Sequence, residues 1–267
     1  MVEPYKFSAG ATPLLISLPH GSTYIPSSIS KRMTQAAKRT PDTDWHVERL
    51  YDFAKDLGAS MIAATHSRYV IDLNRDPSGI QLYKNADNTE LCPTTTFDHE
   101  ALYQPDKAPD GAEIAGRIDQ YWRPYHTRLE EELASLRERY GIAVLFDGHS
   151  IQSEVPRFYT GRIPDLNLGS ANGASAAPEL AEKAFAALLG QNYSAVWDDR
   201  FTGGYITRRY GDPAAGIHAL QLELTWRNYM DEESFRFQPK LAKRLKPLLE
   251  NLIRQLVGWA NEKAGGV

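Results

Sequence analysis

The chain has 267 residues, 42% hydrophobic and 24% charged, which is the composition of an ordinary soluble globular protein, and its formal net charge is -4 at pH 7. This charge balance offers no basic face for nucleic acid and no polybasic membrane anchor, so we expect neither as a partner. The single cysteine, Cys92, excludes an internal disulfide and a cysteine-based zinc cluster. The N-terminus lacks a secretory pattern and no apolar run is long enough to cross a bilayer, so we expect a cytoplasmic protein. The length fits one α/β domain and we see no linker, so we expect a single domain over residues 1–267.

Apolar runs and helical spacing alternate along the chain, which predicts an α/β protein with mainly parallel strands. We expect strands at residues 14–18, 60–65, 69–73, 142–146, 194–197 and 219–222. The spacing also predicts helices from the acidic segment 40–44 to Gly58, over 112–140, over 178–189 and over 238–263. Pro124 and Pro247 are the points where the second and the last of these helices are expected to kink or break. Two segments without periodicity are expected to be long and irregular, residues 76–112 and 151–178.

Three of the predicted strands run directly into side chains that can do chemistry: His20, His149 and Glu223. Because ligands bind just outside the carboxyl ends of strands in open α/β sheets, we expect these side chains to form one site. Neutral imidazole is the commonest zinc ligand, and a catalytic zinc typically has three protein ligands and one open position. The third ligand is expected to be Asp42 or Asp44, at the start of the helix after His20, although either could simply cap that helix.

Glu223 is a carboxylate in an otherwise apolar stretch, where an unpaired charge would be costly to bury. As a general base it would take a proton from the attacking water and then protonate the leaving amine. The alternative is a salt bridge to a nearby arginine. If Glu223 is not the base, Asp147 beside His149 is the next candidate.

Arginines follow predicted strands or lie in predicted loops, which suggests an anionic substrate. Asn74 and Arg75 place an amide beside a guanidinium, a pair suited to bidentate capture of a carboxylate. Further guanidinium groups come from residues in loops or at strand ends, namely Arg68, Arg157, Arg162, Arg208 and Arg209. So many arginines in an acidic chain point to a small dianionic substrate, although some of them are expected to be plain surface charge.

Other features receive a structural interpretation. His126 lies on a predicted helix and is expected to pack and not to catalyse. No Gly-x-Ser-x-Gly elbow surrounds Ser22 or Ser150, and the chain has neither a Walker motif nor a dinucleotide glycine pattern.

Taken together and in order, the motifs resemble those of the N-formylglutamate amidohydrolase (N-formylglutamate deformylase) family. The segments that support this resemblance are Pro19-His20-Gly21-Ser22, Asp42-Thr43-Asp44-Trp45, residues 67–75, Asp147-Gly148-His149-Ser150, residues 201–208 and Gln221-Leu222-Glu223. They extend from about Pro13 to Tyr229, nearly the whole chain. No single motif is specific, but the ordered set is.

The resemblance implies a zinc-carboxypeptidase-like α/β/α sandwich with a mixed, mostly parallel sheet, related to aspartoacylases. It implies a hydrolase with one Zn²⁺ ion, or another divalent metal, that releases formate and L-glutamate from N-formyl-L-glutamate in histidine degradation. His20 and His149 match the metal ligands, the Asn74-Arg75 pair the carboxylate grip, and Glu223 the base. Position 23 is Thr, so the His-x-x-Glu of the carboxypeptidase pattern is absent. We therefore expect Asp44 as the remaining ligand, with Asp42 as its alternative.

Two further roles complete this hypothesis. Arg208 is expected to hold the side-chain carboxylate of the substrate, with Arg157 and Arg162 as additional binders, and Arg68 to oppose the developing oxyanion. The alternatives are a deacylase or carboxypeptidase-like hydrolase for another N-acyl amino acid, and a non-catalytic carboxylate-binding protein. The oligomeric state is open.

Overall fold

A computed structural model describes residues 2–81, 87–190 and 192–265 and contains one seven-stranded sheet in the order β1-β3-β2-β4-β7-β5-β6. Its strands are β1 (Tyr5–Ser8), β2 (Leu14–Leu18), β3 (Ser60–Ala64), β4 (Ala143–Ile151), β5 (Leu166–Gly169), β6 (Ala195–Trp197) and β7 (Ile217–Thr225). The pairs β1–β3 and β7–β5 are antiparallel, and the other neighbours are parallel. The prediction of a mixed, mostly parallel sheet is therefore confirmed.

The helices cover both faces of this sheet. They are α1 (Ser27–Ser30), α2 (Gln35–Lys38), α3 (Val47–Leu50), α4 (Gly111–Arg117), α5 (Arg123–Tyr140), α6 (Pro178–Leu188), α7 (Tyr205–Tyr210) and α8 (Pro239–Ala264). Shorter turns are the 3₁₀ segments η1 (Asp52–Lys55), η3 (Pro213–Ala215) and η4 (Trp226–Asn228) and the π-helical segment η2 (Ile118–Trp122). A two-stranded ribbon pairs β8 (Met230–Asp231) with β9 (Arg236–Phe237).

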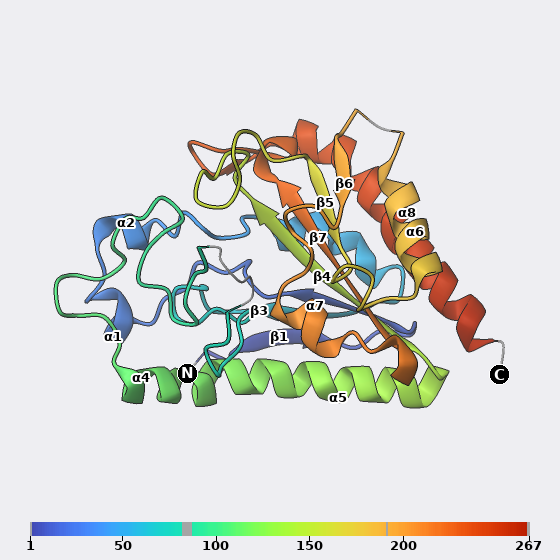
Figure 1. Cartoon of the computed structure of the whole chain (residues 1–267), viewed down its shortest axis with the longest axis horizontal. Helices are drawn as coiled ribbons and strands as arrows, with labels where there is room; N and C mark the ends of the chain where they lie inside the picture. Colours follow the sequence, from blue (N-terminus) through green and yellow to red (C-terminus); the bar gives the residue numbers. More distant parts are fainter. Residues whose placement is uncertain (1, 82–86, 191, 266–267) are drawn as a thin grey trace.

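Two hydrophobic cores separate the three layers (Figure 1). One core packs α3, α6 and α8 against the sheet face that presents Phe146 and Leu222. The other packs the long helix α5 against the opposite face, which presents Leu15 and Leu145. Because side chains alternate along a strand, apolar residues on successive positions serve both cores, which explains why the central strands are apolar throughout. None of the helices in these described residues is both long and apolar enough to cross a membrane.

The structure corrects two predicted elements in the first half of the chain. Residues 69–73 form no strand; they are a buried turn, in which Val70 N–H donates to Ser67 O and Asp72 N–H donates to Leu91 O. The helix expected from residues 40–44 to 57 is reduced to α3 and η1, and His46 precedes it with a left-handed φ of 62°. Tertiary contacts outweigh local preference in both places.

Other predicted elements are in part confirmed and in part corrected. Helix α6, its stop at Gly190 and the edge strand β6 lie where the spacing places them. The long helix is divided just before Pro124, although by a π-helical segment. Helix α8 passes through Pro247 without a break, because its buried apolar stripe packs continuously on the sheet. Strands β1 and β5 were not predicted, and β5 lies within the segment expected to be irregular. In the segment 76–112, the described residues before α4 form no helix and no ladder strand; residues 82–86 lie outside the described residues.

Candidate active site

The site is built on one face of two adjacent strands, β4 and β7. Their parallel register pairs Asp147 with Gln221 and His149 with Glu223. Because side chains two residues apart project to the same face and paired residues share it, all four project to the face covered by α5 and α7. Both strands continue past their predicted ends, so all four residues lie within the sheet and their backbone is held by its hydrogen bonds.

His149 is fully enclosed between two carboxylates. Its Nε2 is 2.7 Å from Asp147 Oδ2, and its Nδ1 is 3.0 Å from Asp44 Oδ2. Burial alone would lower the pKa of His149, but Asp147 and Asp44 raise that pKa well above its usual value. Asp147 is fixed in turn by Ser17, whose hydroxyl donates to Oδ1 over 2.8 Å.

His20 follows β2 directly and has the same arrangement. Its Nε2 is 2.7 Å from Asp72 Oδ1, and since a carboxylate accepts, Nε2 carries the proton. Nδ1 then faces Asp44, whose Oδ2 is 3.8 Å away. Arg68 holds the other oxygen of Asp72 over 2.6 Å. Burial would raise the pKa of Asp72, but Arg68 and His20 hold that pKa well below its usual value.

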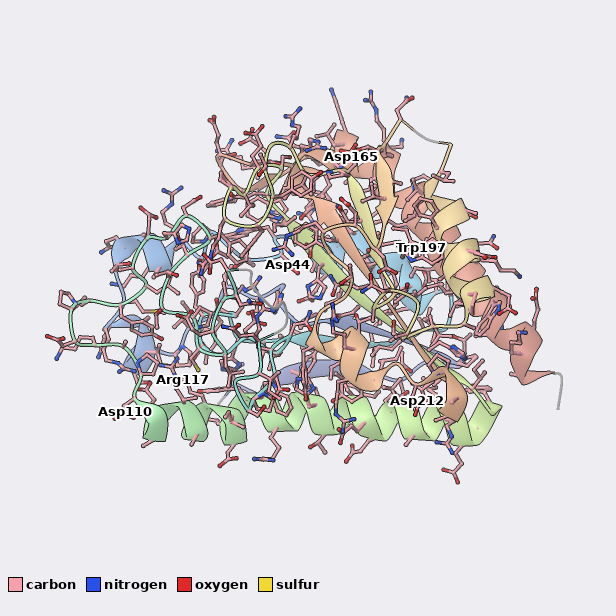
Figure 2. All side chains as sticks on the ribbon, viewed as in Figure 1. Asp44, Asp110, Arg117, Asp165, Trp197 and Asp212 are labelled. Atoms are coloured by element: carbon pink, nitrogen blue, oxygen red, sulfur yellow. The ribbon has the colours of Figure 1, made fainter. Side chains whose placement is uncertain are left out.

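The structure brings Asp44 to both histidines and gives Asp42 a different role. Potential ligand atoms of His20, Asp44 and His149 lie within 4.8 Å of one another, and all three residues are buried. Asp44 N–H donates to His20 O, which ties the two residues together. Figure 2 labels Asp44 near the tips of the central strands. Asp42 instead accepts from Tyr69 Oη at 2.7 Å and from Phe97 N–H at 3.0 Å.

This donor set fits a divalent metal ion. Two imidazoles and a carboxylate are ordinary ligands of a catalytic zinc site. Each imidazole has its Nε2 held by a second carboxylate, as metal-binding histidines usually do, which leaves Nδ1 turned toward Asp44. The negative charge that favours a proton on His149 also favours a cation.

Glu223 lies beside this group and has only 9% of its surface exposed. Burial raises the pKa of Glu223 to about 8, against the opposing charges of His149 and Arg68. Among the described residues we find no hydrogen bond to its carboxylate and no salt bridge to an arginine. A carboxyl group whose pKa lies near neutrality, and whose oxygens are not held by hydrogen bonds or salt bridges, is suited to accept and return a proton.

The segment after Asp72 brings an amide and a guanidinium to the site. The Asn74 side chain is largely engaged within the protein: Nδ2 donates to Asp147 Oδ2 over 3.3 Å, and Oδ1 accepts from Ile206 N–H over 2.8 Å. Arg75 donates through Nε and NH2 to Thr89 and through NH1 to Asn74 O. Both residues line the cavity described next.

A single cavity joins the metal candidate group and Glu223 to three guanidinium groups, those of Arg68, Arg75 and Arg200. Its apolar wall consists of Phe97, Ile151, Phe158 and Phe201. Arg200 donates through Nε to Phe158 O over 2.6 Å. Asp87 and Glu223 also belong to the lining, so the three arginines outnumber the carboxyl groups once Asp44 of the metal group is left out.

Three of the predicted substrate arginines do not line this cavity. Arg157 bridges two loops through Asp87, at 2.9 Å, and Thr96 O, at 2.8 Å. Arg162 is exposed and faces Glu154 at 3.8 Å. Arg208 donates to Gly203 O and to Thr202 Oγ1, and lines a neighbouring cavity that also reaches Arg75.

A family model for N-formylglutamate amidohydrolase matches residues 12–230. The chain belongs to this family. It is 46% identical over 265 residues to N-formylglutamate deformylase of Pseudomonas putida, an alignment that covers 98% of this chain and 99% of the relative. It is 43% identical, with the same coverage, to the N-formylglutamate deformylase of Pseudomonas aeruginosa.

The fold also matches solved structures. The fold matches the crystal structure of N-formylglutamate amidohydrolase from Ralstonia eutropha JMP134 with a TM-score of 0.80 and 25% identity over the full length of both chains. A gene product of Agrobacterium tumefaciens has the same fold, with a TM-score of 0.70, 19% identity and 96% of each chain covered.

Sequence reasoning missed three residues of this amidohydrolase site. Asp72 lies within one of the motifs of the resemblance, residues 67–75, but has no predicted role, and Asp147 is predicted only as an alternative base, although each orients a histidine. Arg200 is not among the predicted site residues. Asp72 and Asp147 are charged residues in apolar surroundings, a signal that could have identified them, whereas nothing in the sequence around Arg200 distinguishes it from surface arginines.

Proposed function

We propose that this chain hydrolyses N-formyl-L-glutamate to formate and L-glutamate with one zinc ion held by His20, Asp44 and His149. The observation that supports this proposal is the buried His-Asp-His group, in which a separate carboxylate orients each imidazole. Its membership of the amidohydrolase family supports the choice of substrate.

The protein's own contribution is to move a proton and to neutralise charge. Zinc, when bound, would act as a Lewis acid toward the formyl carbonyl and lower the pKa of water to about 7. Glu223 takes the proton of the attacking water and passes it to the amide nitrogen, because an amine anion is a very poor leaving group. Arg68 lies in the same cavity and provides a buried positive charge for the oxyanion.

The two carboxylates of the substrate are assigned to Arg75 and Arg200. Both guanidinium groups line the cavity that contains Glu223, whereas Arg208 lines the neighbouring one. The expectation that Arg208 holds the side-chain carboxylate is therefore revised in this proposal. The cavity's four apolar residues leave charge pairing as the main source of selectivity for a dianion.

The assignment of Arg200 is tested by matched lysine variants. Arg200→Lys should reduce kcat/KM for N-formyl-L-glutamate roughly tenfold or more, because a lysine cannot form two parallel bonds to a carboxylate. Arg208→Lys is the control and should change kcat/KM less than Arg200→Lys does. Equal losses in the two variants would contradict the assignment.

The proposed activity is tested by metal analysis together with a substrate panel. We expect stoichiometric zinc in the purified protein, loss of activity with a chelator, and formate release from N-formyl-L-glutamate in preference to N-acetyl-L-glutamate and N-formyl-L-aspartate. Preference for another acyl amino acid would indicate a different deacylase. Carboxylate binding without metal or turnover would indicate a binding protein.

A further inference from the structure

The segment from Asp72 to Arg75 serves the active site although it belongs to no helix or strand. Asp72 orients His20, Asn74 contacts Asp147, and Arg75 lines the substrate cavity. A strand would hold such residues through its ladder of hydrogen bonds, but this segment has none. Its position must therefore be set by other contacts.

Two side chains of the α5 layer donate to alternate carbonyl groups of this segment. His126 Nε2 donates to Leu73 O over 2.8 Å, and Trp122 Nε1 donates to Arg75 O over 3.1 Å. Both aromatic residues are buried. The two bonded carbonyls belong to the peptide groups between Leu73 and Asn74 and between Arg75 and Asp76, so the chain is held just before and just after the Asn74-Arg75 pair.

The two donors form a rigid unit of their own. Trp122 ends the π-helical segment η2 and His126 lies four residues later in α5. Their rings stack with centroids 3.7 Å apart and an interplanar angle of 20°. π-helical turns are rare and occur frequently at functional sites, because the extra residue redirects side chains.

The imidazole is also fixed from its other side. Tyr210 Oη lies 2.8 Å from His126 Nδ1, so the hydroxyl donates to Nδ1 while Nε2–H donates to Leu73 O. This requires a neutral ring. Burial lowers the pKa of His126 to about 3, so the ring is neutral throughout the physiological range.

We propose that Trp122 and His126 are positioning residues for catalysis, which together hold the segment from Asp72 to Arg75 in its working register. His126 sets the Leu73 peptide and through it the Asp72 carboxylate that orients His20. Trp122 sets the Arg75 peptide and through it the guanidinium that faces the substrate. The part of this inference that concerns the substrate rests on the proposed activity toward N-formyl-L-glutamate, and the part that concerns the metal rests only on the proposed zinc site.

Two variants test the roles of Trp122 and His126 separately. Trp122→Phe keeps a stacked ring but loses the donor, and we expect KM for N-formyl-L-glutamate to rise roughly tenfold with zinc affinity unchanged. His126→Leu loses the donor to Leu73 O, and we expect zinc affinity to fall by up to about tenfold, the lower end of the loss caused by removing a carboxylate that orients a ligand histidine. His126→Gln retains an amide donor and should restore most of that affinity.

The control is Tyr103→Phe, which removes a buried hydroxyl that accepts a bond from Arg117; among the described residues, no hydrogen bond joins Tyr103 to the segment from Asp72 to Arg75. It should lower the melting temperature and leave KM and zinc affinity unchanged. Zinc affinity is measured by competition with a chelating dye, and KM by formate release.

If Trp122→Phe and His126→Leu behave like Tyr103→Phe, with lower melting temperatures but wild-type KM and zinc affinity, the positioning role is overturned. If the wild-type protein releases no formate from N-formyl-L-glutamate, the proposed function fails instead. The zinc affinities of His126→Leu and His126→Gln then still test whether His126 positions Asp72 and, through it, His20.

Discussion

The burial of His126 as a neutral ring makes the protein sensitive to mild acid. In the unfolded chain this side chain binds a proton below its usual pKa of 6.5, whereas in the folded protein its pKa is about 3. Between these values the unfolded state binds more protons, so stability is complete above pH 6.5 and declines as the pH falls toward 3. At about 1.4 kcal/mol for each pH unit, lowering the pH to about 5 costs roughly 2 kcal/mol through this residue alone.

The assay compares wild type with His126→Gln, which cannot titrate. The free energy of unfolding is measured with denaturant for both metal-free proteins at about pH 7 and about pH 5. Other histidines whose pKa is lowered by burial, such as His66 and His218, contribute equally to both proteins and cancel. Wild type should lose roughly 2 kcal/mol more than the variant. Equal losses would show that His126 titrates normally in the folded protein and would refute the reasoning.

Three further predictions concern the site itself. Glu223→Gln should retain zinc and substrate affinity while kcat falls by roughly 10² to 10⁴, the usual contribution of a general base; loss of zinc would make Glu223 a ligand. Asp72→Asn should weaken zinc binding by about 10- to 100-fold in a dye competition assay, since an amide is a poorer outer-shell partner for His20, and wild-type affinity would exclude that role. Gly204→Ala places a Cβ 2.2 Å from Asn74 Nδ2, so activity and melting temperature should both fall, whereas Gly116→Ala, with nothing within 4 Å, should be harmless.

The fold class and the core of the site follow from local patterns in the sequence. Strands β2, β4 and β7 are predicted because their apolar runs are bounded by turn residues and polar clusters. His20, His149 and Glu223 then meet because parallel strands present their carboxyl ends at one edge of a sheet. Periodicity and one topological rule are therefore enough to bring these three side chains together.

Some choices depend on long-range contacts that periodicity cannot encode. Asp42 and Asp44 are equivalent in sequence as helix-start residues, and only the bond from Asp44 N–H to His20 O and the contact with His149 distinguish them. The same contacts prevent the helix predicted there from forming.

The remaining parts of the site were decided by tertiary structure alone. Residues 69–73 have strand composition, but their backbone bonds go to Ser67 and Leu91, so they form the buried turn that leads to the segment held by Trp122 and His126. Arg200 reaches the cavity because its guanidinium is tied to Phe158 O, more than forty residues earlier in the chain. A local pattern reports the period of burial along one element, whereas these positions depend on which separate elements pack against each other.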